Sequence, residues 1–262
     1  MLNNRQRQHR GFTIVEMMVT VVLGLSLMSS VLVGYLGVYK GSLNTFGGSR
    51  LGQEANSLMS VMVNEIRRAG YTGQTLTDPS SNSFSQNNST ALAVYNTVAS
   101  NSKQSGTGSG QCILYAYDMD GDGTVDSNEL SGFRLYNGVV QIRTAGNTSS
   151  PDTCAASSTG NTWSDLTDST FMTVTTLTFD LSSSKCLNTR DPDEVDDDTD
   201  GTVDDADEAD CYAHVPTTSS GNITVETRVV AITLTATLAS DSFVRQSLTE
   251  TVRVRNDYVR VR

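Results

Sequence analysis

The sequence predicts an α+β protein in which one long N-terminal helix packs on an antiparallel β-sheet. Residues 12–38 form an apolar run with a single charge, and an apolar stripe at helical spacing continues it towards residue 70. Residues 71–262 contain short runs in which apolar and polar residues alternate, separated by turn residues. Such runs are typical of antiparallel strands buried on one face, so this part should form a β-rich head domain.

The apolar run is long enough to cross a membrane. Residues 12–38 would span roughly 40 Å as a helix, against about 30 Å for the hydrocarbon core of a bilayer. Three arginines, Arg5, Arg7 and Arg10, precede the run and should stay in the cytoplasm by the positive-inside rule. The chain after Lys40 should therefore be exported.

Residues 39–70 should continue this helix as an amphipathic one. Apolar residues recur there at steps of three and four, which makes a stripe able to pack on a sheet. Gly47-Gly48 is a potential interruption, and Gly70 suits the left-handed conformation that ends many helices. The stripe consists of Leu51, Ala55, Leu58, Met62, Ile66 and Ala69.

The expected strands all lie after residue 90. Residues 72–110 are rich in Ser, Thr, Asn and Gly and should form a long exposed connection with one short strand at 91–95. Asn137-Gly138 is a strong signal for a tight hairpin turn. The remaining strands are expected at 113–117, 133–136, 139–143, 223–238 and 248–255.

The charge of the chain argues against nucleic acid as a partner. The sequence has 18 Lys and Arg residues against 29 Asp and Glu residues. The first eleven residues carry three of the arginines and no acid, so the remainder has a formal net charge of −14. A phosphate backbone would be repelled by such a surface.

The four cysteines all lie in the exported part and suit two disulfides in an oxidising compartment. Pairing nearest neighbours would join Cys112 to Cys154 and Cys186 to Cys211, which is one of several connectivities. Free buried thiols are the alternative. A zinc site is not expected, because the sequence has no C-x-x-C spacing.

Residues 118–129 fit the pattern of a twelve-residue calcium loop. Alternate carboxylates can converge on one ion, Gly123 permits the sharp turn, and a carboxylate at the twelfth position can close the shell with two oxygens. Flanking strands argue against a helix-loop-helix unit, and a solvated acidic turn is the alternative. The expected ligands are Asp118, Asp120, Asp122, the Thr124 carbonyl, Asp126 and Glu129.

Residues 196–207 repeat the pattern D-x-D-x-D-G-T-V-D of the first loop. The twelfth residue is Asp207, whose shorter side chain should bind through one oxygen or a water and weaken the site. A solvated acidic run is a stronger alternative here, because residues 191–210 are acidic throughout. The expected ligands are Asp196, Asp198, Asp200, the Thr202 carbonyl, Asp204 and Asp207.

The start of the chain resembles the type IV prepilins with a class III leader, in the segment RGFTIVE at residues 10–16. This resemblance implies that residues 1–11 are a leader, that prepilin peptidase cuts after Gly11, and that the new N-terminal residue Phe12 is methylated. It also implies a role for Glu16, the only charge between Phe12 and Lys40. Glu16 would pair with the amino group of a neighbouring subunit during filament assembly, whereas an acid that reaches the membrane interface is the alternative.

Two further segments, 65–71 and 251–256, resemble PilW-type minor pilins. The resemblance implies a minor pilin that works with other minor pilins and the major pilin in pilus assembly. The head would be periplasmic while the helix is in the inner membrane, and would reach the cell surface within the pilus. A type II secretion pseudopilin of the J type and a calcium-dependent adhesin displayed on a pilus are the alternatives.

An enzyme is not expected. His214 would be the only histidine left after processing, and it lies in the unremarkable stretch 211–216. No glycine-rich phosphate loop follows an expected strand. The sequence therefore predicts an assembly protein with Ca²⁺ as its ligand.

Overall fold

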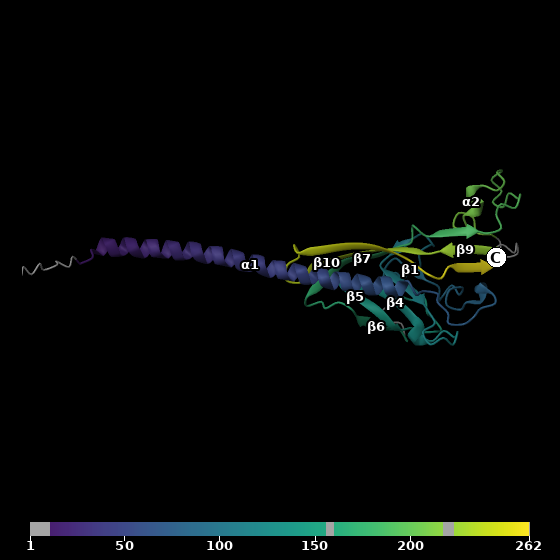
Figure 1. Cartoon of the computed structure of the whole chain (residues 1–262), viewed down its shortest axis with the longest axis horizontal. Helices are drawn as coiled ribbons and strands as arrows, with labels where there is room; N and C mark the ends of the chain where they lie inside the picture. The colour runs from purple at the N-terminus through teal and green to yellow at the C-terminus, as the bar shows by residue number, and fades with distance from the viewer. Residues whose placement is uncertain (1–10, 156–159, 217–222, 262) are drawn as a thin grey trace, which may run out of the picture. The chain divides into compact units, whose positions relative to one another are not determined.

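The computed structural model describes residues 11–155, 160–216 and 223–261. The predicted leader residues 1–10 lie outside this part. The chain divides into two compact units, one that ends at Gly47 and one that begins at Gly48. One helix, α1 (Ile14–Ile66), contributes to both units and is unbroken at Gly47-Gly48, so the potential interruption there is not realised (Figure 1).

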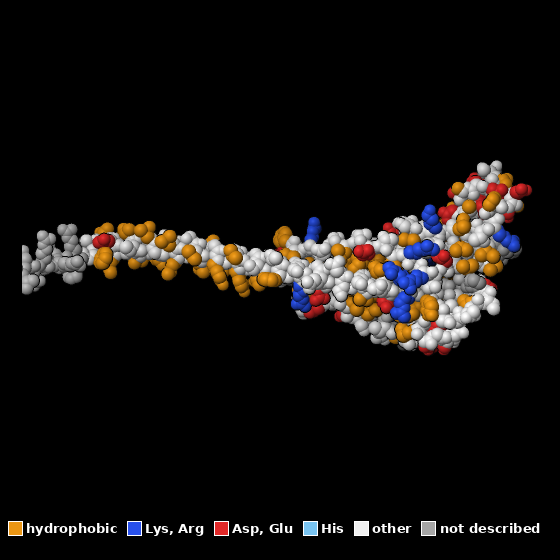
Figure 2. Space-filling model, viewed as in Figure 1, with side chains coloured by type: hydrophobic (Ala, Val, Ile, Leu, Met, Phe, Trp, Pro, Cys, Tyr) orange, Lys and Arg blue, Asp and Glu red, His pale blue; other side chains and the backbone are white. Residues whose placement is uncertain are grey.

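The first unit consists of the apolar part of α1. Among the described residues, α1 is the one helix long and apolar enough to cross a membrane, with a mean hydropathy of 2.1 in its most apolar stretch. Figure 2 shows hydrophobic side chains along this part. The hydroxyls of Thr20, Ser26, Ser29 and Ser30 donate to backbone carbonyls of the preceding turn of the helix. This satisfies their polar groups without water, as a helix in lipid requires.

In the second unit, the rest of α1 packs on the strands through its apolar stripe. Six of its residues are buried, and all of them belong to the main hydrophobic core. The prediction of an amphipathic helix is thus confirmed here. The buried residues are Leu51, Ala55, Leu58, Met59, Met62 and Ile66.

The turns that follow the helix contain the glycine that the sequence indicated, Gly70. α1 stops at Ile66, and residues 67–70 form turns. Gly70 adopts φ +72°, a conformation that glycine accepts without steric cost. Its N–H donates to the Ala116 carbonyl at 2.8 Å, which ties the end of the helix to a strand.

The strands form three antiparallel sheets in the described residues, where the sequence suggested one. Five strands pair in the order β1 (Ala93–Tyr95), β3 (Cys112–Ala116), β4 (Leu130–Tyr136), β5 (Val139–Ala145) and β6 (Thr162–Asp165). Four pair in the order β11 (Arg245–Arg253), β10 (Val229–Leu238), β7 (Met172–Asp180) and β2 (Ser109–Gly110). Three pair in the order β12 (Tyr258–Val261), β9 (Ile223–Thr227) and β8 (Lys185–Asn188).

The tight hairpin at Asn137-Gly138 is confirmed. Both residues have positive φ, 49° and 78°, as the turns favoured between twisted strands require. Val139 pairs with Tyr136 directly across this turn. In contrast, the expected strand 223–238 is two strands in different sheets, β9 and β10, because the chain leaves one sheet and enters another around Arg228.

Two disulfides join the cysteines as nearest neighbours. Cys112 pairs with Cys154 and Cys186 with Cys211, with Cα–Cα distances of 6.5 and 5.2 Å. The second bond connects β8 to the segment after the short helix α2 (Ala206–Ala209). It therefore closes the chain around the second acidic loop.

Met62 provides a test of the packing of α1 on the sheets. The Met62 side chain is 0% exposed in the core, whereas its neighbour Val61 is 41% exposed. We expect Met62→Ala to lower the free energy of unfolding by about 2–5 kcal/mol, through lost burial and the cavity left behind. Val61→Ala, the matched control, should change it by less than about 0.5 kcal/mol. Chemical denaturation of the full-length protein in detergent measures both, and equal effects would contradict this packing.

Candidate functional site

The N-terminus of α1 is capped within the chain. The Thr13 side-chain oxygen accepts the N–H of Glu16 at 3.2 Å. Threonine followed three residues later by glutamate is the pattern of a capping box, a signal that the sequence analysis missed. Phe12 and Glu16 are both exposed, and the described residues contain no ion pair to Glu16. The carboxylate is thus available to a partner outside this chain.

The first acidic loop joins β3 to β4 and gathers its predicted side chains. Carboxylate oxygens of Asp118, Asp120 and Glu129 lie within 4.8 Å of one another, and so do those of Asp120, Asp122 and Asp126. Asp118 and Glu129 are buried, with exposed fractions of 2% and 1%. The Thr124 N–H donates to Asp122 at 2.6 Å, which keeps Thr124 in the same turn.

Backbone N–H groups hold the two buried carboxylates of this loop. Glu129 accepts from Met119 at 2.6 Å with one oxygen and from Asp126 at 2.9 Å with the other. Asp118 accepts from Gly73, Gly121 and Gly123. Burial alone raises the pKa of Asp118, but these hydrogen bonds more than offset it, so its pKa lies below the usual value. Asp118 is therefore an anion at neutral pH.

The first loop is anchored on both sides. The segment after α1 lies against it, because the Asp118 N–H donates to the Tyr71 carbonyl at 2.9 Å. Gly123 adopts φ +77°, and an added Cβ would come within 2.7 Å of the Gln74 side chain. Val125 packs into a small core with Phe84. A loop held in this way presents its carboxylates in a fixed arrangement.

The second acidic loop differs from the prediction at its end. Oxygens of Asp196, Asp198 and Glu208 lie within 4.8 Å of one another. Glu208 is fully buried and accepts from the backbone N–H groups of Asp197 and Asp205, as Glu129 does in the first loop. Asp207, the predicted twelfth ligand, is exposed and belongs to no such cluster among the described residues.

The second loop contains one more residue than the first before its last carboxylate, and this explains why Glu208 takes the position expected for Asp207. Asp205, rather than the predicted Asp204, groups with Asp198 and Asp200. Asp204 has φ 54° and turns towards a separate cluster with Asp191 and Asp193. From Asp205 onward the second loop is therefore shifted by one residue relative to the first. The Thr202 N–H still donates to Asp200, at 2.7 Å, as Thr124 does to Asp122.

Like charges repel one another in the second loop. Burial, followed by the charge of Glu208, raises the pKa of Asp191 above its usual value. The backbone N–H of Asp200 lowers the pKa of Asp198, but burial and the neighbouring carboxylates outweigh it, so this pKa is raised too. Figure 2 shows acidic side chains gathered around α2. Val203 is 52% exposed, so this loop lacks the apolar anchor that Val125 gives the first.

The donor chemistry of both loops fits a hard divalent cation. Each loop brings several carboxylate oxygens together from alternate residues around a glycine with positive φ, Gly123 or Gly201. Oxygen ligands of this kind suit Ca²⁺, which accepts six to eight of them at flexible angles. The residues that could hold an ion are Asp118, Asp120, Asp122, Asp126 and Glu129 in the first loop, and Asp196, Asp198, Asp200, Asp205 and Glu208 in the second.

An apolar N-terminal helix whose second half packs on an antiparallel β-rich head defines a pilin-like protein. The chain matches the family of prepilin peptidase-dependent protein B over residues 44–254 and belongs to this family. It also matches the prokaryotic N-terminal methylation motif over residues 6–32. Comparison with curated proteins and with solved structures gives no match. The matches support a type IV pilin-like protein and do not single out the PilW type.

Proposed function

We propose that this protein is a minor pilin that takes part in assembly of a type IV pilus and presents a calcium-stabilised head. The observation that carries the proposal is the N-terminal methylation motif, followed by an apolar helix in which Glu16 is the one acid before Lys40. Pilin-family proteins are structural in general, which agrees with an assembly role. A pseudopilin of the J type shares this N-terminus and differs in the cellular system that it serves.

Assembly would use the N-terminal end of the apolar helix segment. Prepilin peptidase would cut after Gly11 and leave Phe12 with a free amino group. In the filament, Glu16 of one subunit would pair with that amino group on its neighbour. A buried charge is tolerated when it is paired, and the loss of one partner is strongly destabilising. The pair would thus fix the register of subunits.

Calcium would stabilise the head at the first loop and order the second. In the first loop the ion would be held by buried carboxylates that are already fixed by hydrogen bonds. In the second it would neutralise carboxylates that otherwise repel one another. Exported calcium modules bind at roughly 10⁻⁴ to 10⁻³ M, so such sites would be filled outside the cell and not in the cytoplasm. A head of this kind suits either display at the tip or adhesion.

Variants of Glu16 test the assembly role. We expect Glu16→Ala to leave membrane insertion intact, because it removes a charge from an apolar helix. The substitution should reduce the incorporation of the protein into pili by about tenfold or more, because the amino group of the neighbouring subunit would be buried without its partner. Glu16→Gln should be equally defective. Incorporation is measured by immunoblotting of sheared pili from a strain whose only copy carries the variant.

The glutamine variant separates charge pairing from helix capping. Gln is as suitable as Glu at the third helical position of a capping box, so a purely local role would be rescued by Glu16→Gln. Thr13→Ala is the matched control, since it removes the observed cap and keeps the carboxylate. Normal incorporation of Glu16→Gln together with a defect in Thr13→Ala would show that Glu16 acts within its own helix.

A further inference from the structure

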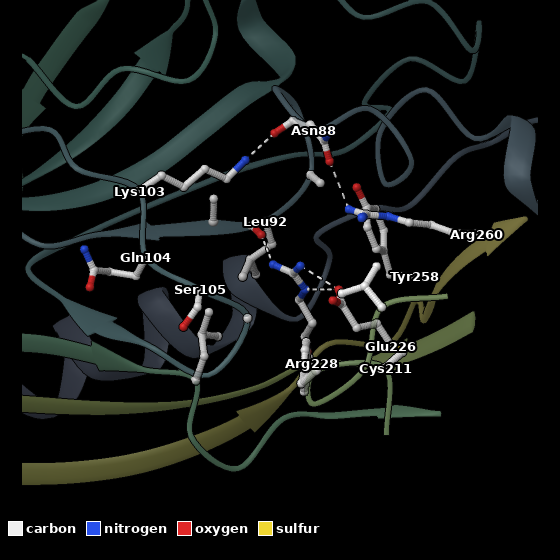
Figure 3. Close-up of a pocket in the computed structure, with 16 residues that line it drawn as sticks. Asn88, Leu92, Lys103, Gln104, Ser105, Cys211, Glu226, Arg228, Tyr258 and Arg260 are labelled. Atoms are coloured by element: carbon white, nitrogen blue, oxygen red, sulfur yellow. Dashed lines mark hydrogen bonds and ion pairs between the residues drawn. The ribbon is translucent and has the colours of Figure 1, made fainter. Parts of the chain in front are cut away.

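A cavity of about 210 Å³ lies in the head, and neither acidic loop contributes a residue to its lining (Figure 3). Its walls come from segments distant in the sequence, including the loops around Asn88 and Lys103, the segment at Cys211-Tyr212, and the strands β9 and β12. Lys103 and Asn88 are exposed at its rim, whereas Tyr258 and Glu226 are buried. The second disulfide supports one wall through Cys211.

The charge of the cavity opposes that of the chain. Three cations, Lys103, Arg228 and Arg260, line it with one carboxylate, Glu226, although the whole protein has a formal net charge of −11. Arg228 is fully engaged, because it pairs with Glu226 at 2.6 Å and donates to the Leu92 carbonyl. The charges of Lys103 and Arg260 are therefore left without a carboxylate in the cavity wall.

Lys103 is exposed as a whole residue, but its ammonium is partly shielded from water at the cavity. This burial, and next the positive charge of Arg228, lower the pKa of the Lys103 ammonium, and Arg260 adds to this effect. Asp152, outside the cavity lining, and Glu226 act in the opposite direction without cancelling it. One residue bridges Lys103 and Arg260, since Lys103 donates to the backbone carbonyl of Asn88 and Arg260 donates to the side-chain oxygen of Asn88 (Figure 3). Asn88 thus holds two basic side chains close together at the cavity.

Three buried polar groups in the cavity make no hydrogen bond of normal geometry with the described residues. They are the Tyr212 hydroxyl, the Tyr258 hydroxyl and the Nε of Arg260. The Tyr258 hydroxyl lies near Arg260 and the Tyr212 hydroxyl near Glu226, but neither contact is a hydrogen bond of normal geometry. Instead, the guanidinium of Arg260 stacks over the Tyr258 ring, 4.2 Å from its centroid. Buried donors without partners are rare and costly, so several in one cavity indicate a missing acceptor.

We propose that this cavity binds a small hydroxylated carboxylate of the size of one sugar, such as a uronic acid. The carboxylate would accept hydrogen bonds from Arg260, Lys103 and a tyrosine hydroxyl, and the fork of a guanidinium matches its planar geometry. Two neutral polar residues, Gln104 and Ser105, also line the cavity on the side of Lys103, and their groups would suit sugar hydroxyls (Figure 3). The volume is below the roughly 300 to 1,000 Å³ of sites for drug-sized ligands, which favours a single ring over a chain.

Binding to the full-length protein in detergent tests this site. Isothermal titration with D-glucuronate should give saturable binding with a millimolar or lower Kd, and titration with D-glucose should give none. Arg260→Gln and Lys103→Gln should each weaken glucuronate binding about tenfold or more, the effect of losing a charged hydrogen bond. Arg245→Gln and Lys185→Gln replace exposed residues outside the cavity lining and are the matched controls, so they should bind as the wild type does.

Several results would overturn the proposal. If inorganic phosphate bound as tightly as glucuronate, the cavity would be a general anion site. If glucose bound as tightly as glucuronate, the carboxylate of the ligand would have no role in binding. Unchanged affinity in Arg260→Gln would place any binding elsewhere. Arg260→Lys is a second test that does not depend on the folding of Arg260→Gln. It keeps the positive charge and removes the planar guanidinium, so it should also weaken glucuronate binding. Melting temperatures establish which variants are folded. A polymer of uronic acid that binds while the monomer does not would show that the ligand is a chain.

Discussion

Replacing Gly11 by tryptophan is expected to leave the whole protein as an uncleaved precursor in the inner membrane. The family match identifies a prepilin peptidase-dependent protein, and the methylation motif spans the predicted cleavage point. The effect should be close to complete, because the bulky ring would fill the space that the peptidase needs beside the scissile bond. Mass spectrometry of the membrane fraction measures it, since the mature chain should begin at Phe12.

The substitution of Gly11 should affect processing without disturbing the fold. A Cβ built on Gly11 meets no heavy atom within 4 Å, so a larger side chain there does not disturb the fold. Gly24, inside the apolar helix, has equally open surroundings. Gly24→Trp is thus the matched control and should be processed normally. A mature chain starting at Phe12 in the Gly11→Trp strain would disprove the predicted cleavage site.

The helix and its packing could be predicted because their signals are local. The apolar run and the stripe from Leu51 to Ile66 follow the helical period, and a period can be read from a sequence without knowledge of the fold. Helix propensity alone indicates a potential interruption at Gly47-Gly48. The helix continues through it because residues on the following turns, such as Leu51 and Ala55, are buried against the sheets.

Strands were predicted less completely. The sequence does not predict β2, β6, β7, β8 or β12, although β7 pairs with β10 along most of its length. β7 contains several threonines, and its burial alternates irregularly around Thr175 and Thr176, opposite a register shift in β10. A bulge of this kind breaks the period of two that identifies a half-buried strand.

The cavity could not be predicted, because its residues are distributed over separate segments of the chain. Lys103 lies in the polar connection, whereas Arg260 lies in a strand that was not expected. No spacing in the sequence connects them. Only the pairing of β12 with β9 brings Tyr258 and Arg260 to the same place as Glu226.

In the two acidic loops, the sequence motif predicts the first carboxylates of each cluster but not the last one of the second loop. The pattern located both loops and the alternate carboxylates at their starts, because the turn around Gly123 or Gly201 is set by neighbouring residues. It assigned Asp207 to the end of the second loop by counting twelve positions. In the structure Glu208, and not Asp207, lies in the cluster with Asp196 and Asp198, because Asp204 is accommodated as an extra residue and the following turn, α2, begins one residue later. The second loop thus ends in a glutamate, like the first.

The position of Glu208 changes the prediction for calcium. We expect the full-length protein in detergent to bind calcium at both loops, with Glu129→Gln losing binding at the first and Glu208→Gln losing it at the second. Each substitution keeps the size of the side chain and removes the charge and one ligand oxygen. At a calcium concentration about ten times its Kd, a site contributes about 1.4 kcal/mol by mass action. The first loop should therefore account for a melting-temperature difference of about 3–6 °C between calcium and chelator, and Glu129→Gln should abolish it.

Asp207→Asn is the matched control for Glu208→Gln, because the two residues are adjacent and both are acidic. Asp207 is exposed and outside the carboxylate cluster, so its substitution should leave calcium binding unchanged. Titration calorimetry counts the ions bound, and thermal unfolding with and without chelator measures the stabilisation. If Asp207→Asn abolished calcium binding at the second loop while Glu208→Gln preserved it, the ligand would be Asp207, as the twelve-residue motif predicts, and not Glu208. If the wild type bound no calcium at millimolar concentrations, both loops would be acidic turns that the backbone N–H groups hold without an ion.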